Sequence, residues 1–169
     1  TPGGTITEFT VSTSGAEIEG ITAGPDGNLW FVELTGNKIG RITTSGTITE
    51  FPLPVATRWP RDIAAGSDEN LWFTEYNGNR IGRITPGGTI AEDLLSGAGI
   101  PRGITGGPDG NVWFTENFSN KIGKITPGGV ITEFPITTPD SSPTGIAMGS
   151  DGNLWFTEWY GNKIGRITP

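Results

Sequence analysis

The chain contains neither cysteine nor histidine among its 169 residues. Without cysteine there is no disulfide, thiol nucleophile or thiolate metal site, and nothing indicates a redox compartment. Without histidine the chain lacks the usual general base near neutral pH and the commonest transition-metal ligand. Enzymes and metal sites that depend on either residue are therefore excluded.

Positive charge and long apolar runs are also scarce. The 11 Lys and Arg residues are outnumbered by 18 Asp and Glu, which leaves a formal net charge of −7. A phosphate backbone would be repelled, so we expect no nucleic-acid partner. No apolar run is long enough to cross a bilayer and no signal segment opens the chain, so we expect no membrane partner. Because the first residue lies inside a repeat unit, we expect a processed protein, a natural fragment of a longer array or an engineered protein.

A block of twenty residues, first seen at 24–43, occurs four times. Its tryptophan recurs at steps of 42, 41 and 42 residues, as Trp30, Trp72, Trp113 and Trp155. Eleven positions never vary: the Gly, Asp and Asn of a turn, then Trp, Phe, Glu, Asn, Ile, Gly, Ile and Thr. Such a small unit cannot bury its own apolar face, so the fold must arise from stacked units.

Each unit contains four short extended runs, which in the first unit span residues 20–24, 29–33, 38–43 and 47–51. The intervening turns are rich in Gly, Asn, Asp and Ser, which predicts an antiparallel meander. Apolar side chains on both faces of the second run indicate a strand between two other sheets. Four-stranded meanders repeating about every 42 residues are typical of an all-β fold, the β-propeller, with four blades in this chain.

The expected blades are residues 10–51, 52–93, 94–134 and 135–169, and the last is completed by a strand at 1–9. This follows because the chain ends after a third strand and opens with a fourth. Sheets pack about 10 Å apart, which places mid-blade about 7 Å from the axis for four blades and about 13 Å for eight. Four blades would crowd their innermost strands. We therefore predict a homodimer, in which two copies share one eight-bladed ring.

The unit Gly-x-Asp-Gly-Asn-Leu-Trp-Phe-Thr-Glu, followed by Asn-Lys-Ile-Gly-Arg-Ile-Thr and Ile-Thr-Glu-Phe, closely resembles the blades of the virginiamycin B lyase (streptogramin lyase) family. The match covers essentially the whole chain. The resemblance implies a seven-bladed single-chain ring and, in the enzymes, Mg²⁺-dependent elimination that opens a cyclic depsipeptide antibiotic. Four blades do not divide into seven, so the chain cannot simply copy that ring.

The resemblance also places the family's catalytic histidines in the turn entering an innermost strand. Arginine cannot deprotonate a substrate usefully and threonine is a poor base, so one glutamate alone could act as a base. We therefore predict that the chain is not an enzyme and has no catalytic residue and no cofactor; Mg²⁺ would matter only to a lyase-like enzyme. The matching positions are Glu19, Arg61, Arg102 and Thr144, and the residues two positions earlier, where the family has a Mg²⁺ ligand, are Glu17, Trp59, Ile100 and Ser142.

A glutamate ends the second strand of every unit. A ring of such carboxylates could hold a hard cation, or each could accept backbone amide hydrogen bonds and staple neighbouring blades. A residue present in every copy is better explained by what every copy needs, so the staple is favoured. The invariant Asp is likewise read as a turn residue rather than a calcium ligand. The glutamates are Glu33, Glu75, Glu116 and Glu158, and the aspartates Asp26, Asp68, Asp109 and Asp151.

The most variable segments link one unit to the next, at residues 10–19, 52–61, 93–102 and 135–144. Variable loops on a rigid frame commonly carry specificity. Arg58, Trp59, Arg61 and Arg102 form a cationic, aromatic cluster that could hold an anionic or planar ligand, with solvated loops as the alternative. Together with Glu19 and Thr144, these are the candidate ligand-binding residues. Trp59 and Trp159 are expected to be exposed, and the four repeated tryptophans to lie in the core.

Two functions follow from these observations. The first is a non-catalytic repeat scaffold that assembles into a closed symmetric ring. The alternative is a ligand-binding module or a Mg²⁺-dependent streptogramin lyase-like enzyme.

Overall fold

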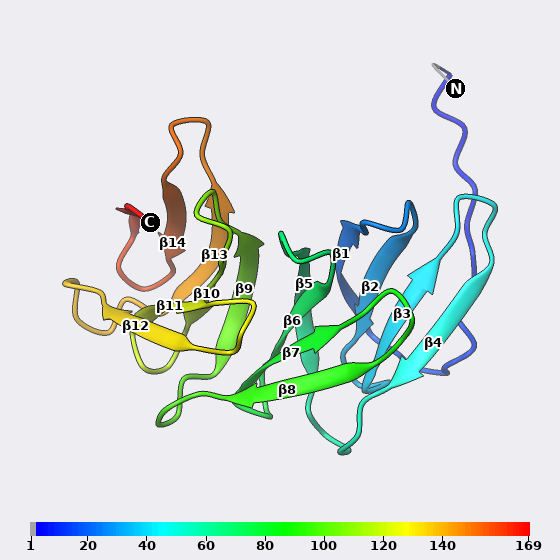
Figure 1. The fold of residues 1–169 in the computed structure, drawn as a ribbon, viewed down its shortest axis with the longest axis horizontal. Coiled ribbons are helices and arrows are strands. Elements are labelled where there is room, and N and C mark those ends of the chain that lie inside the picture. Colours follow the sequence, from blue (N-terminus) through cyan, green and yellow to red (C-terminus); the bar gives the residue numbers. More distant parts are fainter. Residues whose placement is uncertain (1–2) are drawn as a thin grey trace.

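The computed structural model describes residues 3–169, which form strands and turns without a helix (Figure 1). Three sheets have four antiparallel strands and one has three, and each sheet follows chain order. The strands are β1 (Ile18–Ala23), β2 (Leu29–Glu33), β3 (Lys38–Ile42), β4 (Ile48–Pro52); β5 (Pro60–Ala65), β6 (Leu71–Glu75), β7 (Arg80–Ile84), β8 (Ile90–Leu94); β9 (Pro101–Gly106), β10 (Val112–Glu116), β11 (Lys121–Ile125), β12 (Ile131–Pro135); and β13 (Pro143–Met148), β14 (Leu154–Glu158), β15 (Lys163–Ile167).

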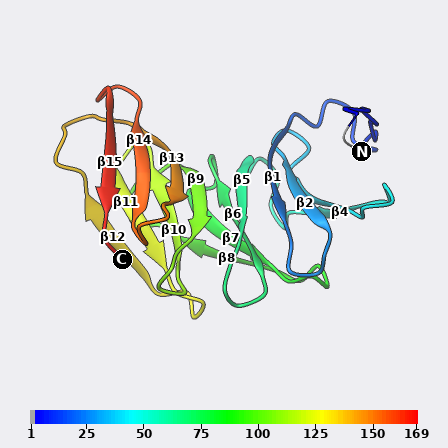
Figure 2. The same ribbon diagram turned by 90° about the horizontal axis from the view of Figure 1, so that it is seen from above.

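The four sheets are the predicted propeller blades, here called blades 1 to 4. The innermost strands β1, β5, β9 and β13 lie side by side, and the blades fan outward from them along an open arc (Figure 1, Figure 2). Blade 1 and blade 4 lie at opposite ends of this arc in both views. Over residues 3–169, no helix exists that could serve as a membrane span.

The invariant turn residues act through hydrogen bonds, as the turn interpretation predicts. Asp26 accepts a bond from the Asn28 amide and a second, at 3.0 Å, from the Trp30 indole nitrogen. The same indole bond recurs at Asp68, Asp109 and Asp151. The Asp therefore both closes the turn and orients the tryptophan, which sequence reasoning did not foresee.

The invariant glycine of the third strand makes room for the invariant phenylalanine. Gly82 pairs with Phe73 across β6 and β7, and a Cβ at Gly82 would overlap the Phe73 ring. The same overlap recurs in the other blades, at Gly40, Gly123 and Gly165. Each blade thus folds a phenylalanine ring over its own backbone.

Three apolar clusters lie between successive blades. In the first, Trp30, Val32 and Ile39 of blade 1 pack against Leu71 and Phe73 of blade 2, among others. Equivalent residues form the clusters between blades 2 and 3 and between blades 3 and 4. Each blade therefore has a tryptophan face (Trp30, Val32 and Ile39 in blade 1) and a leucine face (Ile21, Leu29 and Phe31 in blade 1). The tryptophan face of one blade packs on the leucine face of the next.

The strand predicted at residues 1–9 does not form within the single chain. Residues 1 and 2 lie outside the described part, and residues 3–9 belong to no sheet. Blade 4 accordingly has three strands rather than four. The reason is distance along the arc, because the N-terminal segment lies beside blade 1 and β15 lies at the other end (Figure 2).

Candidate functional site

The four positions that match the family's histidines come together in one cavity, but they lie within the innermost strands rather than in the turns that enter them. The cavity has a volume of about 230 Å³ and lies where the innermost strands begin. Its polar lining comes from Glu19 of β1, Arg61 and Asp62 of β5, Arg102 of β9 and Thr144 of β13. We call it the central cavity. It combines two guanidinium groups with two carboxylates and a hydroxyl.

The two arginines of the central cavity differ in their partners. Arg61 Nε lies 3.5 Å from Glu19 Oε2, and its guanidinium lies over the Tyr76 ring. Arg102 has no carboxylate in ion-pair range among residues 3–169. Burial lowers the pKa of Arg102, and the positive charge of Arg61 lowers it further. Arg102 is thus a partly buried cation that forms no ion pair among residues 3–169, although Glu19 is near enough to act on its pKa.

Arg102 also lines a second cavity of about 300 Å³. Its other lining residues are Asn117, Ser142, Trp159 and Tyr160. Trp159 and Tyr160 are largely exposed, as predicted for Trp159. Arg102 therefore lines both the central cavity and an aromatic, polar recess.

Asp62 is a site residue that sequence reasoning missed. Its Oδ2 accepts the backbone amide of Ile104 in the next blade at 3.1 Å, and its Oδ1 accepts the amide of Ile63 at 2.9 Å. Burial raises the pKa of this carboxyl. The signal was available in the sequence, because the other units have glycine at this position (Gly20, Gly103 and Gly145).

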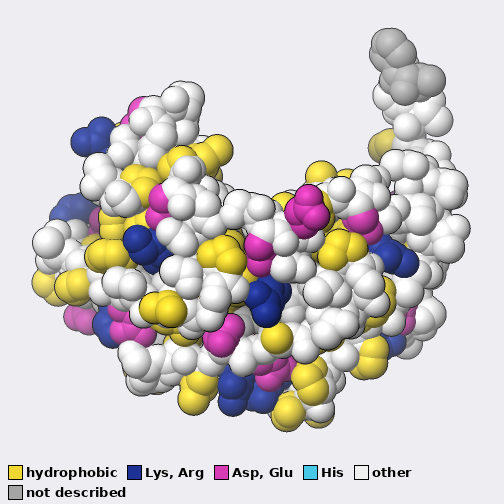
Figure 3. Space-filling model, viewed as in Figure 1, with side chains coloured by type: hydrophobic (Ala, Val, Ile, Leu, Met, Phe, Trp, Pro, Cys, Tyr) yellow, Lys and Arg dark blue, Asp and Glu magenta, His cyan; other side chains and the backbone are white. Residues whose placement is uncertain are grey.

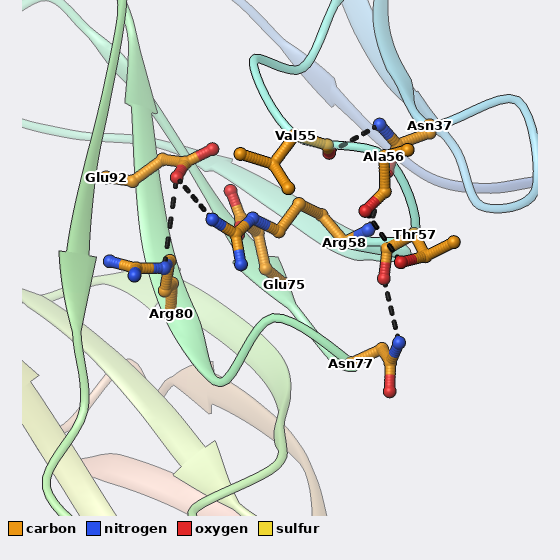
Figure 4. A network of polar contacts seen from close by, with 9 residues as sticks. All are labelled: Asn37, Val55, Ala56, Thr57, Arg58, Glu75, Asn77, Arg80 and Glu92. Atoms are coloured by element: carbon orange, nitrogen blue, oxygen red, sulfur yellow. Dashed lines mark hydrogen bonds and ion pairs between the residues drawn. The ribbon is translucent and has the colours of Figure 1, made fainter.

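The predicted cluster of Arg58, Trp59, Arg61 and Arg102 is divided in the structure. Arg58 and Trp59 do not line the central cavity. Arg58 extends instead between Glu75 and Glu92, at 3.4 and 3.3 Å, and Arg80 approaches Glu92 at 3.9 Å (Figure 4). Trp59 has a positive φ of 54° and is 40% exposed, as expected for a loop tryptophan. Arg58, in the loop before β5, therefore points to the acidic network, whereas Arg61, in β5 itself, lines the central cavity.

The recurring glutamates do not staple neighbouring blades, so the favoured interpretation is wrong. All four are buried, and oxygens of each lack a hydrogen-bond partner among the described residues. The glutamates do not reach the next blade because their carboxylates point toward the turn of their own blade. In blade 2, for example, Glu75 Oε2 lies so close to Gly78 that a Cβ on this glycine would be 2.5 Å from it. The glutamates lie in separate blades, and residues 3–169 contain no cluster of three potential metal ligands.

Threonine makes the staple instead. Thr74 Oγ1 donates to the carbonyl of Arg102 in the next blade at 2.8 Å, and accepts the Asp62 amide of its own blade at 3.1 Å. Thr115 links blade 3 to the carbonyl of Thr144 in the same way, at 2.8 Å. These bonds fix the backbone that carries Arg102 and Thr144 into the central cavity. Sequence reasoning missed them because the first unit has Val32 at this position.

The acidic network around Glu75 makes the stability of the chain depend on pH. Burial raises the pKa of Glu75 to about 8, and the neighbouring charge of Glu92 contributes to the increase. A carboxyl with a raised pKa in the folded state stabilises that state while it is protonated. This stabilisation is complete below the unfolded-state pKa and is lost as pH rises through about 8.

We therefore expect the unfolding free energy to fall between pH 5 and pH 8, by at most about 1.4 kcal/mol per pH unit for this group. Glu75→Gln, which mimics the protonated acid, should flatten this slope. The exposed Glu69→Gln serves as a control and should leave it unchanged. Urea unfolding at several pH values measures the slope. Equal slopes for the wild type and Glu75→Gln would show that Glu75 ionises freely.

The comparisons with known proteins agree on one family. The family model described as "Virginiamycin B lyase family" matches residues 1–169. A virginiamycin B lyase from Staphylococcus aureus aligns over 100% of this chain with 49% identity and a TM-score of 0.97. A catalytically inactive histidine variant of the lyase from that organism, solved with quinupristin, aligns over 98% with 50% identity and a TM-score of 0.95. A streptogramin B lyase structure aligns over 96% with 47% identity and a TM-score of 0.93. No curated protein matches the chain.

The chain spans little more than half of these relatives, covering 58%, 57% and 55% of their lengths. The propeller fold predicted from the repeats is confirmed by these matches. With its whole length matched by the family model and with nearly half of its residues identical to those of the aligned lyases, the chain belongs to the virginiamycin B lyase family.

Proposed function

We propose that this four-blade chain is a non-catalytic scaffold that forms a closed ring with a second copy of itself. One observation carries the proposal. The two ends of the arc expose the two halves of an interface that occurs three times inside the chain. Figure 3 displays the open edge of the arc, with hydrophobic side chains at the surface on both sides of it.

Blade 1 exposes two of the three residues of its leucine face, whereas the third, Phe31, is buried. Leu29 is 40% exposed, whereas the equivalent Leu71 in blade 2 is 0% exposed. Ile21 is 61% exposed, against 3% for Ile63. Inside the chain this face is covered by the tryptophan face of the preceding blade, and blade 1 has no preceding blade among the described residues.

Blade 4 exposes its tryptophan face. Trp155 is 40% exposed although Trp113 is fully buried, and Ile164 is 71% exposed against 1% for Ile122. Thr157 occupies the stapling position of Thr74, but its hydroxyl pairs with Thr144 of its own blade. Blade 4 therefore has both the apolar residues and the hydroxyl of a normal junction.

The two exposed faces are complementary to each other rather than to themselves. The tryptophan face of one copy fits the leucine face of another, and the reverse contact forms at the other end of the arc. Two such contacts close a ring with twofold symmetry and cover both apolar ends. Copies that failed to close would polymerise, so closure also protects solubility.

The absence of lyase activity is proposed from the chemistry of the central cavity. Elimination requires a base for the α-proton and an acid for the leaving oxygen. An arginine guanidinium cannot serve as a useful base, and a threonine hydroxyl is a weak one. Glu19 is the remaining candidate base, and its carboxylate lies 3.5 Å from Arg61 Nε.

Two measurements test the proposal. Light scattering over a concentration series should give twice the chain mass of 17.8 kDa. Incubation with a streptogramin B and Mg²⁺ should leave the depsipeptide ring closed. A particle that stays at the mass of one chain would refute the assembly, and turnover that Glu19→Gln abolishes would refute the non-catalytic assignment.

A binding module is a second candidate, favoured by Arg102, which lines both cavities and has no ion pair among residues 3–169. An aromatic carboxylate could accept hydrogen bonds from Arg102 and place its ring toward Trp159 and Tyr160. We expect Arg102→Gln to weaken binding of benzoate by roughly tenfold or more, the size of a charge-assisted hydrogen bond. Arg102→Lys keeps the positive charge but loses the planar guanidinium that donates two hydrogen bonds to one carboxylate, so it should weaken benzoate binding to an intermediate extent. Calorimetric titration measures this, and equal affinities for all three proteins would eliminate the site.

A further inference from the structure

We propose that residues 5–9 of one copy form the missing fourth strand of blade 4 in the second copy, paired in a defined register with β15. The inference rests on the ring proposed above and specifies how its junctions are built. It starts from a sequence identity: Thr5-Ile6-Thr7-Glu8-Phe9 repeats the residues at 47–51, which include most of β4.

The N-terminal segment already lies where the outermost strand of a preceding blade would lie. Phe9 packs against Gly46 in the turn between β3 and β4, and Phe51 packs in the same way against Gly88 of the next blade. Ser12 Oγ donates to Glu50 Oε1 at 2.8 Å, as Ser96 Oγ donates to Glu133 in blade 3. The segment is thus docked on its blade 1 side.

The side of residues 5–9 that faces away from blade 1 is exposed to solvent. Ile6 is 86% exposed and Phe9 is 48% exposed. Within the described chain, residues 3–9 have no strand partner. An extended segment with alternating apolar residues and free backbone groups is the form in which a strand is added to a sheet edge.

Blade 4 offers the matching edge. Among residues 3–169, no strand lies on the outer side of β15. A groove of about 290 Å³ is lined by Phe134, Ile136, Phe156, Arg166 and Ile167 among others. In blade 1 the equivalent edge, β3, is covered by β4. An uncovered edge next to an apolar groove is an unfinished sheet.

The register follows from blade 1. There, Arg41 pairs with Thr49 and Gly40 with Glu50. Transferred to the junction, Arg166 pairs with the Thr7 of the second copy, and the other pairs follow. These are Ile167 with Ile6, Gly165 with Glu8 and Ile164 with Phe9.

Two side chains of blade 4 lack partners that this register supplies. Lys163 Nζ donates to Thr138 Oγ1 at 2.9 Å, whereas its counterpart Lys38 contacts both a threonine and Glu50, the latter at 2.6 Å. Glu8 of the second copy stands in the place of Glu50. Likewise Trp30 stacks on Phe51 with ring centroids 5.5 Å apart, and Trp155 receives Phe9 as its stacking partner.

Because the chain has no native cysteine, an engineered disulfide reads out the register directly. Thr7→Cys combined with Arg166→Cys should give a covalent dimer on mild oxidation, since facing strand residues lie within disulfide reach. Thr5→Cys with Arg166→Cys, two residues out of register, is the control and should cross-link at least tenfold less. Circular dichroism confirms that both variants fold.

A charge exchange tests the same pairing without oxidation. Glu8→Lys or Lys163→Glu alone should raise the dimer dissociation constant several-fold, and the two together should restore it. A wild-type chain that stays monomeric contradicts both the ring and the strand exchange. A dimer that forms without the Thr7–Arg166 cross-link and without charge rescue contradicts the strand exchange alone and leaves the ring standing.

Discussion

Replacing Trp113 by alanine should lower the unfolding free energy of the chain by about 3–5 kcal/mol, the usual cost of removing a buried tryptophan. Trp113 is fully buried between blades 3 and 4 and stacks on Phe134 at 5.6 Å. Its indole nitrogen donates to Asp109 at 3.0 Å. The substitution therefore opens a cavity and also leaves the turn aspartate without its indole partner.

Trp155→Ala is the matched control, because the same residue of blade 4 makes the same bond to Asp151 but lies on an exposed face. At concentrations where the chain is monomeric, this change should cost less than half as much as Trp113→Ala. At concentrations where the ring forms, the two costs should approach each other, because the junction then buries Trp155. Urea unfolding at low and high protein concentration measures both. If both substitutions lowered the unfolding free energy equally at every protein concentration, the contribution of Trp155 would not depend on a second copy, and the prediction would be wrong.

The blade architecture could be predicted from the sequence because the repeat and its turns are local signals. The predicted second strand, 29–33, coincides with β2, and the third, 38–43, ends one residue after β3. The predicted fourth, 47–51, begins and ends one residue before β4, and the first, 20–24, begins two residues after β1 and ends one residue after it. Hairpin turns fix strand ends through Asn and Gly at positions that require positive φ, such as Asn37 and Gly46. Antiparallel neighbours joined by such turns need no long-range information.

The direction of side chains at the site could not be predicted in the same way. Arg58 in the loop before β5 and Arg61 at the start of β5 are three residues apart, yet one reaches Glu75 and the other the central cavity. Thr57 and Trp59, which flank Arg58, both have a positive φ, and neither residue type signals this. The prediction that the recurring glutamates link neighbouring blades was wrong for a related reason. A residue that occurs in every unit is needed by every blade, but its recurrence does not indicate the direction of its carboxylate.

Ring closure sets a geometric condition on the proposed dimer. Four blades covering 58% of a lyase imply about seven blades in that protein if blade size is similar. A seven-bladed ring turns about 51° per blade and an eight-bladed ring about 45°. The TM-score of 0.97 indicates that this chain has the curvature of the lyase. Two copies therefore close only if the rotation from one blade to the next decreases by about 6° at every junction, a small change that the apolar contacts between blades must absorb.

The second large effect concerns Gly82, whose substitution by alanine should destabilise the chain by about 3 kcal/mol or more, at the upper end of overpacking effects. A Cβ there would overlap the Phe73 ring, and Phe73 is fully buried in the cluster between blades 1 and 2. The ring cannot move aside without displacing Leu71 and Ile84 of the same cluster. Gly87→Ala is the control, because the nearest atom to its Cβ, Thr85 Oγ1, is 3.7 Å away. Thermal unfolding should show a midpoint lower by roughly 6–12 °C for Gly82→Ala and little change for Gly87→Ala. A Gly82→Ala chain as stable as the wild type would mean that the blade can shift its Phe ring, and that the glycine present in all four units serves another purpose.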